Sequence, residues 1–108
     1  MFWIITQDCI DAGQVGAGRY NGGSTLVIRD AKLRQEATDH FVNEHASQFE
    51  HEFQLLDDDR RVYLLGRCAG LDDADGDAAF EPLDWATPRY GCTAMRYRKV
   101  GAVEWEDL

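Results

Sequence analysis

Residues 51–68, HEFQLLDDDRRVYLLGRC, decide the fold of this chain. In 51–55 the side chains of Glu52 and Gln54 alternate with less polar ones, and in 62–68 the even-numbered positions alternate with Tyr63, Leu65 and Arg67. A period of two is that of a β-strand with one buried face. Residues 57–60, DDDR, have the composition of a tight exposed turn. The stretch therefore predicts an antiparallel hairpin.

Other strands are predicted on both sides of this hairpin. Residues 2–7 (FWIITQ) are rich in β-branched and aromatic side chains, and 24–29 (STLVIR) are strand-like. A last strand from 93 to 97 returns through 103–105 after a turn at 99–102. Thr93, Met95 and Tyr97 are expected to face inward. Residues 13–23, with five glycines, and 70–84, with six acids, are predicted loops.

One amphipathic helix is predicted at about 30–49. Apolar or aromatic side chains recur there every four residues, at Leu33, Ala37, Phe41, His45 and Phe49. Asp30 is a suitable N-cap. We expect the helix to pack on an antiparallel sheet of about four to six strands, which makes an α+β fold.

Length and composition indicate one domain spanning 1–108. Hydrophobic residues make up 44% of the chain, enough for a core without staples. No apolar run reaches the length of a membrane span, and the N-terminus lacks a basic leader. We therefore expect a cytoplasmic protein. Its three cysteines, Cys9, Cys68 and Cys92, are expected to be buried thiols in a reducing compartment.

The charge balance limits the class of partner. Twenty acids against eleven bases give a net charge of −9. A field of this sign repels phosphates, so direct nucleic-acid binding and anionic membranes are disfavoured and a basic partner is favoured. A GC-rich genome would explain why Arg outnumbers Lys, and a salt-adapted host would explain an acidic surface. In that alternative the charge serves solubility alone.

No motif names a reaction, a cofactor or a metal. The glycine-rich segment lacks the third glycine of a dinucleotide fingerprint, where Asn21 stands. The acidic segment resembles a calcium loop around Gly76, but Leu71 and Pro82 occupy two essential ligand positions. His45 lies on the apolar stripe, where a hydrogen-bonded core histidine is the simpler interpretation. We expect no catalytic residue, no metal and no cofactor.

Two segments, FQLLDDDRRVYLLGR and FEPLDWATPRYGCTAMRY with a Trp-containing last strand, resemble short uncharacterised proteins of bacterial chromosomes, plasmids and phages. The resemblance covers about 49–108, with FWIIT as a third match. It leaves 24–48 outside as an insertion that carries the helix. It implies a sheet architecture and no site, because no activity is established for such proteins.

Our first functional hypothesis is a small acidic protein-binding or inhibitor protein, either monomer or homodimer. Its acidic face would occupy a basic nucleic-acid-binding surface, as anti-CRISPR and anti-restriction proteins do. The expected partner-binding acids are Asp57, Asp58, Asp59, Asp72, Asp73, Asp75, Asp77, Glu81, Asp84, Glu104 and Glu106, supplemented by Arg60, Arg61, Arg96 and Arg98. The alternative is a small-molecule-binding domain or small enzyme with a site near the glycine-rich loop, 13–23.

Overall fold

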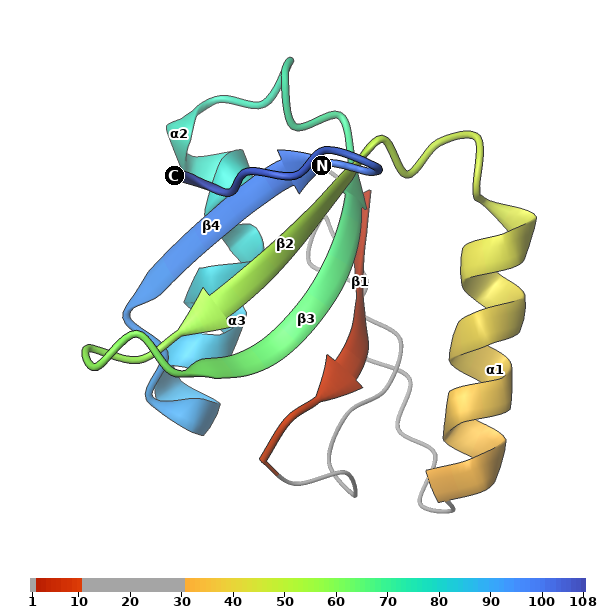
Figure 1. Ribbon diagram of the computed structural model, residues 1–108, viewed down its shortest axis with the longest axis horizontal. Coiled ribbons are helices and arrows are strands. Elements are labelled where there is room, and N and C mark those ends of the chain that lie inside the picture. Colours follow the sequence, from red (N-terminus) through yellow and green to blue (C-terminus); the bar gives the residue numbers. More distant parts are fainter. Residues whose placement is uncertain (1, 11–30) are drawn as a thin grey trace.

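The computed structural model describes residues 2–10 and 31–108. It contains one antiparallel five-stranded sheet with the strand order β1-β3-β2-β4-β5, and helices that pack against it (Figure 1). The strands are β1 (Phe2–Asp8), β2 (His51–Leu56), β3 (Val62–Ala69), β4 (Ala94–Lys99) and β5 (Glu106–Asp107), and the helices are α1 (Ala31–Glu44), α2 (Gly76–Ala79) and α3 (Glu81–Tyr90). The predicted α+β class is confirmed. The predicted strand 24–29 and the glycine-rich loop 13–23 lie outside the described residues.

The predicted hairpin forms the centre of the sheet. β2 and β3 pair antiparallel with His51 opposite Cys68 and Leu55 opposite Leu64. Arg60 takes a left-handed conformation with φ 66°, which lets five residues reverse the chain. Pairing of β1 outside β3 and of β4 outside β2 buries the hairpin on both edges.

The core lies on one face of this sheet. Alternate side chains of β1, β2 and β3, including Trp3, Ile5, Phe53 and Leu64, form a buried cluster on that face. Gly66 belongs to the same face, and a Cβ there would lie 2.2 Å from Cζ of Phe53. The Phe53 ring therefore fills the space above a glycine, which explains why this strand position carries no side chain.

The helix that covers the core face was not predicted. α3 lies behind the sheet in Figure 1 and contributes Ala86 to the core cluster, with Leu83, Trp85 and Tyr90 packed around it. The prediction of a loop over 70–84 is therefore wrong for its second half, where α2 and the start of α3 form. The signals were present as N-cap Asp75, a proline in the first turn of α3 and the left-handed C-cap Gly91.

The predicted helix exists, but it packs beside the sheet rather than over its core. α1 stands next to the edge strand β1 in Figure 1 and ends at Glu44, five residues short of the predicted boundary. The ring of Phe2 in β1 contacts the rings of Phe41 at 5.4 Å and Phe49 at 5.0 Å. His45 joins this aromatic cluster and donates its Nδ1–H to the Phe41 carbonyl at 2.9 Å. The expected hydrogen bond is present, but His45 is half-buried and lies outside the core cluster.

The C-terminal return was predicted in the wrong place. β4 pairs with β5 through Arg96 opposite Asp107 and Tyr97 opposite Glu106, so the return strand follows 103–105 instead of coinciding with it. Trp105 instead stacks on the guanidinium of Arg98, 4.1 Å from the ring centre. Thr93, expected inside, is exposed and donates a hydrogen bond to Asp58 at 2.6 Å.

Candidate functional site

The predicted acids are divided between the two ends of the sheet. Asp57, Asp58 and Asp59 lie in the turn before β3, whereas Asp72 and Asp73 follow its last residue. An eight-residue strand is about 25 Å long, so these groups do not form one continuous face. Asp75 and Asp77 lie at the start of α2, and Glu81 and Asp84 lie in α3.

Several of these carboxylates have structural partners. Oδ1 of Asp57 accepts hydrogen bonds from the backbone N–H groups of Asp59 and Arg61, both at 2.9 Å. These bonds, above all the one from Arg61, lower the pKa of Asp57. Asp75 caps α2 by accepting from the Ala78 N–H at 2.8 Å. The positions of these acids are explained by hydrogen bonds within the fold, without a binding partner.

Glu81 also has a structural role. Its Oε2 accepts a hydrogen bond from the buried Trp3 indole at 3.3 Å, which satisfies the polar atom of a core side chain. Asp84 lies one turn further along α3 and is exposed. Neither residue lines the hollow that lies where β2 begins and β4 ends.

The remaining acids gather where β2 begins and β3 and β4 end. We call this surface the acidic end and define it by the exposed residues Glu50, Asp72, Asp73, Glu104 and Glu106. Asp72, Glu104 and Glu106 line a hollow of about 300 Å³, together with His51, Tyr97 and Lys99. A carboxylate oxygen of Glu50 lies within 4.8 Å of a carboxylate oxygen of Asp72 and of a ring nitrogen of His51. Lys99 is the basic residue in this hollow whose charge has no ion-pair partner among the described residues.

Apolar side chains lie beside this acidic hollow. Val103 is 86% exposed and Val100 is 43% exposed, a high value for large aliphatic residues. The N–H of Val100 donates to the Glu50 carbonyl at 2.9 Å, which fixes the loop against the acidic end. Exposed apolar side chains surrounded by charges are typical of a protein-binding surface.

Tyr97 forms an aromatic wall of the hollow. Burial, and then the charge and hydrogen bond of Glu106, raise the pKa of Tyr97. Its hydroxyl therefore stays protonated and acts as a donor to that carboxylate. Tyr97 also contacts the His51 ring, with 6.0 Å between ring centres. An aromatic wall with carboxylates around it suits the side chain of a Lys or Arg.

His51 does not have the surroundings of a metal ligand, although Glu50, His51 and Asp72 form a cluster of three ligand types. His51 is 2% exposed, and its Nε2 faces Oδ1 of Asp72 at 3.7 Å. Its buried Nδ1 has no hydrogen-bond partner among the residues that the structure describes. A metal on Nε2 would move the proton to Nδ1, where no described residue accepts it. The tautomer that donates toward Asp72 is therefore favoured.

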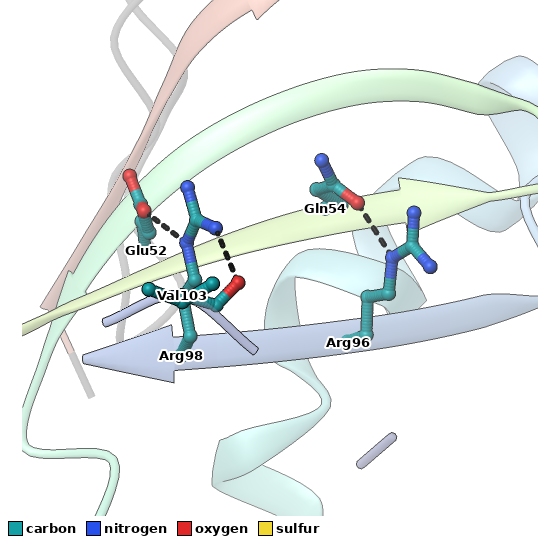
Figure 2. A network of polar contacts seen from close by, with 5 residues as sticks. All are labelled: Glu52, Gln54, Arg96, Arg98 and Val103. Carbon is teal, nitrogen blue, oxygen red and sulfur yellow. Dashed lines mark hydrogen bonds and ion pairs between the residues drawn. The ribbon is translucent and has the colours of Figure 1, made fainter. Parts of the chain in front are cut away.

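The predicted basic residues are also divided. Arg60 lies in the β2–β3 turn and forms an ion pair with Asp107 at 2.9 Å, and Arg61 follows it as an exposed side chain. Arg96 and Arg98 lie in β4 on the sheet face opposite the core (Figure 2). Arg98 is held by Glu52 at 2.5 Å and also borders the acidic hollow.

The cysteine prediction holds for two of three thiols. Cys68 and Cys92 are buried, and burial raises their pKa values to about 12 and about 11. Cys9 is exposed, contrary to expectation, because it follows the end of β1. Burial and the neighbouring Asp8 raise the pKa of the Cys9 thiol as well, so none of the three has the lowered pKa of a nucleophilic cysteine.

Sequence reasoning found the acids but missed the non-acidic members of the site. His51, Tyr97, Val100 and Val103 meet there only because β2 and β4 pair and the turn after Lys99 folds over their ends. The exposed valines of the 99–105 segment were a usable signal, since apolar side chains are unusual in a turn.

None of the helices within the described ranges has the length and apolar character that a membrane span requires. Comparison of the chain with protein-family models, with curated proteins and with solved structures finds no match. The acidic end is therefore interpreted from its own geometry.

Proposed function

We propose that this chain is a non-catalytic protein-binding module whose acidic end binds a basic protein surface. The observation that carries the proposal is the exposed pair Val100 and Val103 beside a hollow whose rim carries Asp72, Glu104 and Glu106. Apolar contacts supply affinity, while the surrounding carboxylates select a cationic partner and accelerate encounter.

The hollow is suited to one basic side chain of the partner. With a volume of about 300 Å³, it is large enough for an Arg or Lys side chain next to Tyr97. The stem of that side chain would pack on the aromatic ring and its charge would meet Glu106. A basic surface of this kind is what a nucleic-acid-binding complex offers. We therefore propose that the chain competes with nucleic acid for such a surface, as anti-defence proteins do.

The test compares two triple variants that carry the same net charge. One neutralises the acidic end by Asp73→Asn, Glu104→Gln and Glu106→Gln. The control neutralises three exposed acids elsewhere, by Glu36→Gln, Asp59→Asn and Asp84→Asn. Partners are captured from bacterial lysate on the tagged wild-type chain, and the purified partner is then titrated with each variant at low and high salt.

We expect the acidic-end variant to bind the basic partner at least about tenfold more weakly, since each lost charge-assisted contact contributes about 1.5–3 kcal/mol. The control variant should bind within about twofold of wild type, and added DNA should displace the wild-type chain. Equal weakening by both variants would mean that net charge alone drives binding. Retention of no protein by the wild type would remove the proposal.

A further inference from the structure

The sheet face opposite the core carries a second polar surface, which we call the arginine face. It is defined by Glu52, Gln54, Arg67, Arg96 and Arg98, all half-buried, with Trp105 at its rim. In the strand register Glu52 of β2 lies between Arg67 of β3 and Arg98 of β4. Arginines therefore flank one carboxylate on both sides in a chain whose net charge is −9.

Arg98 forms an ion pair with that carboxylate. Its Nε donates to Oε1 of Glu52 at 2.5 Å, and its second donor group reaches the Val103 carbonyl at 3.2 Å (Figure 2). Within the described part of the chain, no hydrogen bond or ion pair holds the guanidinium of Arg67. The row formed by Arg67, Glu52 and Arg98 across three strands therefore has one excess positive charge, at Arg67.

Arg96 fixes the orientation of a neutral neighbour. Its Nε donates to Oε1 of Gln54 at 2.5 Å (Figure 2). Since an arginine can only donate, the atom it contacts must be the amide oxygen. The NH₂ group of Gln54 is then a donor that no other described residue engages. Asp107, the strand partner of Arg96, is engaged by Arg60. Gln54 thus offers a donor, and Arg96 adds a second positive charge nearby.

A hollow of about 270 Å³ opens over these groups. The residues that line it include Thr6, Gln54, Arg67, Arg98 and Trp105. Its lining has two arginines against Glu52, a balance of one positive charge. A second hollow of about 310 Å³ shares Thr6 and Arg67 but is bordered on α1 by Asp39, so an anion is better accommodated in the first.

We propose that the first hollow binds a small ligand with a carboxylate or phosphate group. The anionic group lies against Arg67, whose planar fork donates two parallel hydrogen bonds, and the Gln54 NH₂ group supplies a third donor. The remaining part of the ligand packs on the Trp105 ring, on which the Arg98 guanidinium also stacks. This site uses residues outside the acidic end, apart from Arg98 at their boundary, and its existence does not depend on the proposed protein partner.

The test is a titration of the whole ¹⁵N-labelled chain with inorganic phosphate and, separately, with succinate at constant ionic strength. Sodium chloride at the same ionic strength is the third arm. We expect saturable shifts of the Arg67 Nε–H and the Gln54 side-chain NH₂ signals with at least one of the two probes. The probe that binds more tightly identifies phosphate or carboxylate as the ligand group.

Two variants locate the site. Arg67→Gln should weaken the binding of the effective probe at least tenfold, and Gln54→Glu, which replaces the donor by a carboxylate, should weaken it to a similar degree. Arg89→Gln, an exposed arginine of α3 whose guanidinium stacks on Trp85, should leave binding unchanged. The thermal midpoint of each variant shows that it is folded.

The proposal is overturned if sodium chloride produces the same shifts, or if neither probe gives saturable shifts. It is also overturned if folded Arg67→Gln and Gln54→Glu bind the probe as wild type does. None of these three results would affect the acidic end, whose test uses a protein partner and a different set of variants.

Discussion

Gly66→Ala should be the most destabilising single-methyl change in this protein. A Cβ at Gly66 would lie 2.2 Å from Cζ of Phe53 and 2.6 Å from the carbonyl oxygen of Ile4. Phe53 is 0% exposed, and the Ile4 carbonyl belongs to the backbone of the neighbouring strand, so neither can move freely. Overpacking of a core costs about 1–3 kcal/mol, and two rigid obstacles place this case near 3 kcal/mol.

The loss is measured by urea unfolding followed through tryptophan fluorescence, which reports on the buried Trp3. At this size about 3 kcal/mol corresponds to a fall in Tm of about 12 °C. Gly76→Ala is the matched control, because no atom of the described residues lies within 4 Å of a Cβ there and the residue begins α2. It should be neutral or stabilising by about 0.5 kcal/mol.

A second variant tests the cause of the loss. Phe53→Leu shortens the obstructing ring and costs about 1.5 kcal/mol by itself. The double variant with Gly66→Ala and Phe53→Leu should lose at least about 1 kcal/mol less stability than the sum of the two single-variant losses. The clash with the Ile4 carbonyl remains in the double variant. If Gly66→Ala unfolds within about 0.5 kcal/mol of wild type, the packing argument is wrong.

His51→Leu should stabilise the protein by about 1 kcal/mol in the same urea assay, because it removes, at similar volume, a buried Nδ1 that no described residue pairs with. A loss of stability would show that the contact with Asp72 outweighs this cost. Asp57→Ala should lower Tm at neutral pH, since the Arg61 N–H stabilises the ionised carboxylate and holds its folded pKa below the usual 3.8. That stabilisation is complete above the unfolded value and disappears as pH falls through the lower folded pKa, so the Tm difference should vanish in strong acid. Asp59→Ala, in the same turn, should show no such difference, and a difference constant down to strong acid would contradict the mechanism.

The sequence alone predicted the elements whose hydrogen bonding is local. The hairpin at 51–68 is visible because a period of two and a turn rich in Asp act over neighbouring residues. The helix that became α1 is visible for the same reason, although its end at Glu44 was not. α3 was missed because Pro82, Pro88 and the preceding acids resemble a loop, while burial of Ala86 against the core stabilises the helix.

The candidate sites depend on the tertiary structure. Acidic composition was evident from the sequence, but only the structure shows that the length of β3 separates Asp57 from Asp72 and that the pairing of β2 with β4 brings Glu50 close to Val100. Gln54, Arg67 and Arg98 are far apart along the chain and share one hollow because β3, β2 and β4 are neighbours in register. Local patterns determine which segments become strands, whereas long-range pairing decides which side chains face one another.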